Sequence, residues 1–195
     1  MTAEPRAYAL ALGEEGREHD ASLADRLDRL RNLEDDSARL LALLATIRAP
    51  KRALELGTSN GVSTIWLADA LRRTGGRLRT VELEAERSAA AGEHLAACGL
   101  ADVVELVVGD AGAVLAEEPD AAYGLVFLDA ERPAYPGYWE DLIRVLEPGG
   151  LLVVDNVRSH ADQVAPFREL VEADAHVDWA DAPSGAGLLL IAKLP

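Results

Sequence analysis

The chain has 195 residues, which is enough for one domain with a substantial hydrophobic core. Its 34 acidic and 19 basic residues give a formal net charge of −15. A surface this negative repels nucleic-acid phosphates and anionic lipid headgroups, so composition argues against nucleic-acid and membrane partners.

The sequence carries no sign of export. No apolar run approaches transmembrane length, and the N-terminus has no hydrophobic signal-peptide core. Cys98 is the only cysteine, so no disulfide forms within the chain, which suits a reducing compartment. We expect a cytoplasmic protein in which Cys98 is a buried thiol.

Residues 1–50 show the leucine spacing of helices. The first stripe comprises Leu23, Leu27, Leu30 and Leu33. These leucines fall at three- and four-residue intervals, and a denser apolar face follows at residues 40–47. Arginines alternate with aspartates over residues 25–31, which we interpret as a solvated helix face. The stripe either packs on its own domain or forms the contact of a homodimer.

From Arg52 onward, short apolar runs alternate with helical patterns. The strand-like runs are Ala53–Leu56, Leu78–Val81, Val103–Val108, Leu125–Leu128, Leu151–Val154, His176–Trp179 and Leu188–Ala192. The helical stretches are Ser63–Arg73, Ala85–Ala97, Ala111–Ala116, Tyr138–Leu146 and Asp162–Ala173. Continuous apolar strands joined by helices predict a parallel sheet that is covered on both faces.

The last two runs are separated by a connection of hairpin length, which makes the final strand antiparallel. We therefore predict an α/β protein with a Rossmann-like, doubly wound, mostly parallel seven-stranded sheet. Residues 1–195 form one domain, with N-terminal helices in 1–50 and the sheet in 51–195.

The segment ALELGTSNGVS, residues 53–63, predicts a strand, a tight turn and a helix start. Gly57 and Gly61 let the backbone approach a ligand, and the free N–H groups of a helix start favour polar or anionic groups. The alternative is a tight turn that binds nothing.

Carboxylates gather at the predicted carboxyl ends of the strands, where doubly wound sheets bind ligands. These ends carry Glu55 and Gly57, Glu82, Gly109 to Ala111, Asp129, and Asp155 with Asn156. Glu82 lies 25 residues after Gly57, where a carboxylate accepts hydrogen bonds from ribose hydroxyls. Asp110 is placed to accept from the exocyclic amine of a base.

Asp129, Asp155 and Asn156 end adjacent predicted strands. Two carboxylates and an amide oxygen form a hard, all-oxygen set that suits Mg²⁺, Ca²⁺ or Mn²⁺. The alternative is that these side chains cap the following helices or turns.

With these motifs in order, the chain resembles the class I S-adenosylmethionine-dependent O-methyltransferases. It is most similar to the small cation-dependent group that includes the catechol and caffeoyl-CoA O-methyltransferases and their bacterial relatives. The matching segments are ALELGTSNGVSTIWLA, TVELE, VVGDA, LVFLDAERPAY, LEPGGLLVVDNV and GLLLIAKLP. They run from about residue 48 to the C-terminus in the order expected of that family.

The resemblance implies a role for each matching position. The residues implied to hold S-adenosylmethionine are Glu55, Gly57, Ser59, Gly61, Ser63, Glu82, Leu83, Gly109, Asp110, Ala111 and Asp129. The cation, Mg²⁺ with Ca²⁺ or Mn²⁺ as alternatives, is implied to bind Asp129, Asp155 and Asn156. Tyr135 matches a tyrosine that closes the site.

Two features depart from the family pattern. Arg132 stands where the family usually has a lysine that helps to take the acceptor's proton. Arginine stays protonated and cannot act as that base, although it can stabilise a phenolate or bind a carboxylate. His160, five residues after Asp155, is the alternative base by position, or else an exposed loop residue. The predicted catalytic set is therefore Asp129, Arg132 and His160.

The second departure is the segment before the first strand, which lacks the proline-containing substrate gate of the bacterial relatives. Tyr138 and Trp139 either wall an aromatic acceptor or pack in the core. We expect an O-methyltransferase that acts on a small, hydroxylated, catechol-like acceptor with a divalent cation. A metal-independent methyltransferase acting on another oxygen or nitrogen, a nicotinamide dehydrogenase and a non-catalytic cofactor-binding protein are the alternatives.

Overall fold

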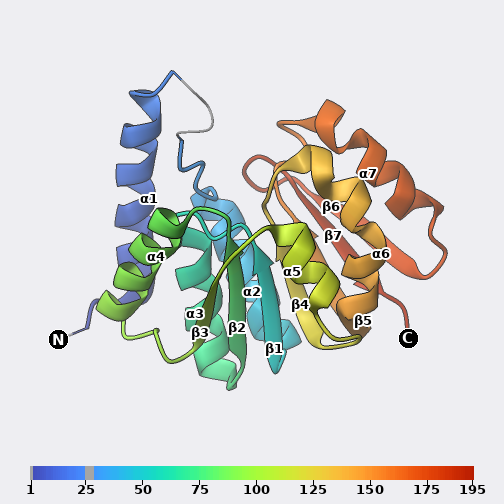
Figure 1. Ribbon diagram of the computed structural model, residues 1–195, viewed down its shortest axis with the longest axis horizontal. Helices are drawn as coiled ribbons and strands as arrows, with labels where there is room; N and C mark the ends of the chain where they lie inside the picture. The colour runs from blue at the N-terminus through green and yellow to red at the C-terminus, as the bar shows by residue number, and fades with distance from the viewer. Residues whose placement is uncertain (1, 25–28) are drawn as a thin grey trace.

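The computed structural model describes residues 2–24 and 29–195. Two helices, α1 (Pro5–Ala21) and α2 (Asp35–Arg48), precede an alternation of strands and helices (Figure 1). The strands are β1 (Arg52–Leu56), β2 (Arg77–Glu82), β3 (Val104–Val108), β4 (Tyr123–Leu128), β5 (Leu146–Val154), β6 (Val177–Ala182) and β7 (Leu188–Lys193). The remaining helices are α3 (Val62–Thr74), α4 (Ala85–Ala97), α5 (Ala111–Glu117), η1 (Arg132–Ala134), α6 (Tyr135–Val145) and α7 (Ala161–Ala173).

The strands of the described chain form one seven-stranded sheet in the order β3-β2-β1-β4-β5-β7-β6. The first five strands in this order are parallel, and β7 runs antiparallel to both β5 and β6. The predicted fold class is therefore confirmed. The strand order reverses between β1 and β4, so the ends of these two strands flank the crevice in which doubly wound sheets bind ligands.

Helices cover both faces of the sheet because the strand residues alternate between two cores. Ala53 of β1 packs with α1, α2 and α3, whereas Leu54 and Leu56 pack in a second core with α6 and α7. In Figure 1, α5, α6 and α7 lie together on the right-hand side of the molecule. This two-residue period explains why both faces of every central strand are apolar.

The prediction of a leucine-striped helix before residue 34 is wrong. Leu27 lies outside the described residues, but α1 ends at Ala21 and residues 29–34 are not helical. The Asp20 carboxylate accepts the backbone N–H groups of Leu30 and Arg31 at 2.7 and 2.8 Å, which fixes these residues in a loop. Helical spacing of leucines does not distinguish a helix from a loop that buries the same side chains.

Two further expectations concern single properties of the chain. Cys98 is buried as predicted, with 1% of its surface exposed. Among the described residues, no helix has both the length and the apolar character needed to cross a lipid bilayer.

Candidate functional site

A cavity of about 530 Å³ opens at the carboxyl ends of the parallel strands, where β1 and β4 diverge. Its walls come from the loop before α2, the turn after β1, and the ends of β2, β3 and β4. The predicted site residues line it with three exceptions, which are Glu55, Gly61 and Asp155. Most of the residues predicted from the sequence therefore lie around one cavity.

The turn after β1 requires glycine at its first position. Gly57 has a φ of 105°, and a Cβ atom there would lie 2.2 Å from the carbonyl oxygen of Asp129. Gly61 has a φ of 94° and forms the N-cap of α3. Positive φ values strain other residues, so these glycines allow the backbone to pass close to the end of β4.

Glu55 lies beneath this turn and is fully buried. Its Oε2 accepts hydrogen bonds from the hydroxyls of Thr64 and Thr80, both at 2.6 Å, whereas its Oε1 has no partner. Burial raises the pKa of Glu55 to about 7, against the opposing effect of these hydroxyls. The side chain ties β1, β2 and α3 together rather than facing the cavity.

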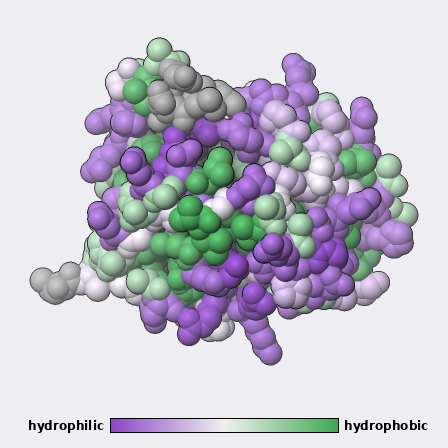
Figure 2. All heavy atoms as spheres, viewed as in Figure 1, coloured by the Kyte–Doolittle hydropathy of each residue, from purple (hydrophilic) through white to green (hydrophobic). Residues whose placement is uncertain are grey.

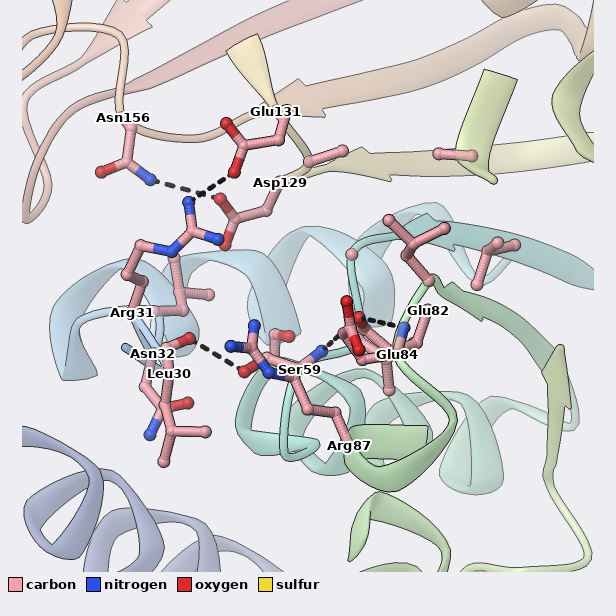
Figure 3. Close-up of a pocket in the computed structure, with 18 of the residues that line it drawn as sticks. Leu30, Arg31, Asn32, Ser59, Glu82, Glu84, Arg87, Asp129, Glu131 and Asn156 are labelled. Carbon is pink, nitrogen blue, oxygen red and sulfur yellow. Dashed lines mark hydrogen bonds and ion pairs between the residues drawn. The ribbon is translucent and has the colours of Figure 1, made fainter. Parts of the chain in front are cut away.

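Glu82, at the end of β2, is held rigidly beside the turn. Its two carboxylate oxygens accept the backbone N–H groups of Ser59 at 2.7 Å and Glu84 at 3.0 Å (Figure 3). The side chain lines the cavity although the residue is only 8% exposed. Because each carboxylate oxygen has two lone pairs, Glu82 keeps acceptor capacity toward the cavity.

Exposed apolar side chains and an acidic side chain lie together at the ends of β2 and β3. Leu83 is 64% exposed and Val108 is 55% exposed, and Figure 2 shows hydrophobic surface gathered over these strands. Asp110 accepts the backbone N–H of Ala113 at 2.9 Å and so caps α5. Asp110 thus has a structural role as well as a place in the cavity lining.

Asp129, Asp155 and Asn156 form a compact cluster at the ends of β4 and β5. The Asn156 amide donates to Asp129 Oδ1 at 3.2 Å and to Asp155 Oδ2 at 2.7 Å. Asp155 is 3% exposed, and its Oδ1 has no hydrogen-bond partner. Burial raises the pKa of both carboxyls, and the proximity of Asp129 further raises the pKa of Asp155.

This cluster meets the chemical demands of a hard cation. The half-buried Asp129 and the buried Asp155, which has an orphaned oxygen, leave negative charge that a divalent cation would neutralise. The Asn156 amide nitrogen faces both carboxylates, and its oxygen accepts from the Ser159 hydroxyl at 3.3 Å, so the amide would have to turn over to present its oxygen to a cation. Within residues 2–24 and 29–195, no group of three or more histidine, cysteine, aspartate or glutamate side chains is arranged to hold a metal. The predicted set has two carboxylates and an amide instead.

The two other predicted catalytic residues also line the cavity. Arg132 begins η1, and its Nε donates to Gln163 Oε1 at 3.0 Å. His160 is the N-cap residue of α7, and its Nδ1 lies 2.9 Å from the Ser159 hydroxyl. Both therefore come from the segments that follow β4 and β5, on the same side of the cavity as the carboxylate cluster.

Of the aromatic residues after β4, only Tyr138 lines the cavity within the described chain. Tyr135 is fully buried and donates to the Ala130 carbonyl at 3.0 Å, so it supports the wall and does not close the site. Trp139 packs edge-on against Phe167 in the core. The sequence left open whether Tyr138 and Trp139 line the cavity or pack in the core. In the structure Tyr138 lines the cavity and Trp139 packs in the core.

The loop before α2 is the part of the site that the sequence interpretation missed. Leu30, Arg31 and Asn32 line the cavity, and Ser59 donates to the Leu30 carbonyl at 2.8 Å. Figure 3 shows the Arg31 guanidinium reaching toward Glu131, with which it forms an ion pair at 2.9 Å, and lying beside Asp129. Arg29 and Arg31, just before α2, are the sequence signal for this part of the cavity. The sequence pattern alone favours a solvated helix face for them.

The chain is similar to known O-methyltransferases. Residues 15–191 match the O-methyltransferase protein family. A catechol O-methyltransferase of Mycobacterium tuberculosis is 38% identical over 149 residues, or 71% of this chain and 66% of that protein. One of Niastella koreensis is 36% identical over 129 residues, or 65% of this chain and 58% of that protein. The alignments thus span 66% and 58% of the lengths of these relatives.

Solved structures share the fold over nearly the whole chain. The O-methyltransferase TomG of Streptomyces achromogenes, involved in tomaymycin synthesis and solved with S-adenosylmethionine, has a TM-score of 0.82 at 30% identity. That match covers 100% of this chain and 92% of TomG. An O-methyltransferase of Bacillus cereus, solved with S-adenosylhomocysteine, has a TM-score of 0.80 at 23% identity, with 96% and 90% covered. The fold, the strand-end site and the family match over residues 15–191 lead to one conclusion: this chain belongs to the O-methyltransferase family.

Proposed function

We propose that this chain transfers a methyl group from S-adenosylmethionine to a hydroxyl of a small, catechol-like acceptor, assisted by a divalent cation. The observation that carries the proposal is the hydrogen-bonded cluster of Asp129, Asp155 and Asn156 at one end of the cavity. The names of the relatives and the neighbour solved with S-adenosylmethionine support methyl transfer to a hydroxyl.

The turn after β1 and the end of β2 would hold the cofactor. Ser59 and Ser63 line the wall beside Gly57, where the backbone is open to the methionine end of the ligand. Glu82 would accept the ribose hydroxyls, because its carboxylate is already fixed by two backbone donors. Leu83 and Ala111 would flank the adenine. Exposed apolar side chains at this position favour a flat, apolar ring.

The opposite end of the cavity would hold the acceptor. Asp129 and Asp155 would supply carboxylate ligands and Asn156 an amide oxygen to Mg²⁺, with Ca²⁺ or Mn²⁺ as alternatives. When bound, such a cation lowers the pKa of a coordinated hydroxyl. Tyr138 would pack against an aromatic ring, and the loop around Leu30 would shield that ring from water. These residues would align the acceptor oxygen with the methyl group.

The proposal is tested with catechol, S-adenosylmethionine and each divalent cation after dialysis against EDTA. We expect product only when a cation is restored. Asp155→Ala should lower the rate by at least about 100-fold, since metal assistance contributes several kcal/mol. Asp178→Ala, which removes an exposed carboxylate on β6, is the matched control. Titration calorimetry with Mn²⁺ gives a second readout, because Asp155→Ala should abolish cation binding.

Each alternative function predicts a different result. Activity that survives EDTA and Asp155→Ala would show a metal-independent methyltransferase. Tight cofactor binding with no product across a varied acceptor panel would show a binding protein without turnover. Binding of NAD⁺ in place of S-adenosylmethionine would show a dehydrogenase site.

We also propose a homodimer, which now rests on exposed apolar residues of α2 and not on the leucine stripe. The leucine stripe is not a helix in the described chain, but Leu43 and Ile47 of α2 are 54% and 72% exposed. Apolar side chains on one helix face favour a contact between copies. Sedimentation velocity over a range of concentrations measures the oligomeric state directly.

A further inference from the structure

A second cavity lies at the opposite edge of the sheet, at the amino ends of β1, β2 and β3. It has a volume of about 250 Å³, and apolar residues of the same strands form part of its wall. Its charged lining consists of Arg52, Arg77, Arg79 and Glu105. The candidate site described above lies at the carboxyl ends of the parallel strands, so the two cavities are separate.

The basic character of this edge is visible in the sequence. Residues 48–52 (RAPKR) and 72–79 (RRTGGRLR) lead into β1 and β2 and contain seven of the 19 basic residues of the chain. Neither segment contains an acidic residue, although the net charge of the chain is −15. The carboxyl edge of the sheet carries the carboxylates of Glu82, Asp129 and Asp155 instead. The two edges of the sheet therefore have opposite character.

The strand register places two arginines next to each other. Arg52 of β1 and Arg77 of β2 are directly paired residues of parallel strands, so their side chains leave the same face of the sheet. Like charges opposite each other on neighbouring strands are unfavourable. The two side chains turn apart, because Arg52 Nη2 donates to the Tyr123 hydroxyl of β4 at 3.1 Å, on one side of the pair. On the other side, Arg77 Nη1 donates to the Asp102 carbonyl, before β3, at 2.6 Å.

The carboxylates near this cavity are held mainly by the third arginine. Arg79 Nη1 pairs with Glu105, and Arg79 Nε lies 2.7 Å from Glu118. Arg52 Nη2 lies 4.0 Å from Glu118, which is the outer limit of an ion pair. Arg77 forms no ion pair with any residue that the structure describes. Three positive charges thus face two negative ones, and the excess positive charge lies on Arg52 and Arg77.

Both of these arginines keep hydrogen-bond donors for a ligand. A guanidinium carries five N–H donors on three nitrogens, and the hydrogen bonds to the described residues use one nitrogen of Arg52 and one of Arg77. The edge of a guanidinium binds phosphate oxygens through two parallel, charge-assisted hydrogen bonds. An anion with several oxygens between the two side chains would accept from both and offset their repulsion.

We propose that the cavity formed by Arg52, Arg77 and Arg79 binds a small phosphate-bearing molecule, with its phosphate between Arg52 and Arg77. The acidic surface of the chain repels extended polyanions such as nucleic acids, so the ligand is a small molecule that enters the cavity. This inference goes beyond the proposed function, because it concerns a different ligand at the other edge of the sheet.

The first test titrates pyrophosphate into the whole protein in the presence of S-adenosylhomocysteine, with EDTA to remove divalent cations. Calorimetry at constant ionic strength should give saturable binding that is at least about tenfold tighter than the binding of sulfate, because pyrophosphate offers more oxygens to two guanidiniums. Equal affinities for the two anions, or no saturation with pyrophosphate, would show charge screening alone and overturn the inference.

The second test changes the arginines. Arg77→Gln removes an exposed side chain and should weaken pyrophosphate binding by at least about tenfold, as should Arg52→Gln. Arg17→Gln on α1 is the matched control, because the side chains of Arg17 and Arg52 are both 48% exposed, and its affinity should be unchanged. If Arg52→Gln fails to fold, Arg77→Gln decides the matter. An unchanged affinity in Arg77→Gln, or an equal loss in Arg17→Gln, would contradict a specific site.

Amide chemical shifts locate the anion independently of its affinity. In ¹H–¹⁵N spectra, pyrophosphate should move the signals of Arg52, Arg77 and Arg79 and leave those of Gly57 and Glu82 in place. Shifts confined to Gly57 and Glu82 would place the anion at the carboxyl edge and overturn the inference. Because neither measurement depends on methyl transfer, failure of the proposed function would leave the result of this test unaffected.

Discussion

Glu55→Gln tests whether a buried carboxyl beneath the glycine turn makes the fold pH-sensitive. The pKa of Glu55 is raised from its ordinary value of 4.5 to about 7 because the side chain is fully buried. At about 1.4 kcal/mol per pH unit, this difference corresponds to about 3 kcal/mol of stability.

The direction follows from proton binding in the two states. Below pH 4.5 the carboxyl is protonated in both the folded and the unfolded chain, and the full stability is present. Between pH 4.5 and 7 the unfolded chain releases the proton that the folded chain keeps, so rising pH favours unfolding. The contribution of about 3 kcal/mol is lost as pH rises through 7.

The assay is urea denaturation at several pH values from 4.5 to 8, in EDTA so that cation binding adds no pH dependence. The free energy of unfolding of the wild type should fall relative to Glu55→Gln by about 3 kcal/mol across this range. Glu86→Gln, which removes an exposed carboxylate from α4, controls for the loss of one charge. A constant difference between wild type and Glu55→Gln at every pH would refute the reasoning.

Three further predictions concern other parts of the site and core. Gly57→Ala should unfold at a markedly lower temperature than Gly75→Ala, since both have positive φ but only Gly57 would bring a Cβ within 2.2 Å of the Asp129 carbonyl; equal melting temperatures would contradict the clash. Glu82→Gln should weaken S-adenosylmethionine binding by roughly tenfold in calorimetry, because the acceptor loses its charge and its new NH₂ group faces a backbone N–H that an oxygen had accepted. The buried Cys98 thiol should react with a chromogenic disulfide reagent only at the rate of unfolding, and fast reaction of the native protein would show that it is exposed.

The sheet and its ligand-binding edge were predictable from the sequence because they depend on local patterns. Short apolar runs such as Leu125–Leu128, bounded by glycines and helical stretches, are typical of buried strands. The carboxyl ends of parallel strands lie at one edge of the sheet. The sequence therefore predicted that Glu82, Asp129 and Asp155, which follow such strands, lie at the same edge.

The covering loop was not predictable in this way, because its shape depends on distant contacts. The Asp20 carboxylate and the Ser59 hydroxyl both form hydrogen bonds with the backbone of Leu30. Neither hydrogen bond produces a periodic pattern of residues from which it could be predicted. The same limit applies to Tyr135, whose orientation is set by the Ala130 carbonyl and by packing on Phe167. Residue identity alone does not choose between cavity and core.

The loop held by Asp20 has a consequence for how the lining of the cavity can be changed by substitution. Leu30, Arg31 and Asn32 line the cavity from one short stretch, whereas its other walls come from the sheet and the turn after β1. The Asp20 carboxylate holds the loop through the backbone N–H groups of Leu30 and Arg31. These two hydrogen bonds do not depend on the side chains of Leu30 and Arg31. We expect substitutions of Arg31 and Asn32 to change which molecules fit the cavity while the sheet stays intact, so the segment is suited to combinatorial libraries.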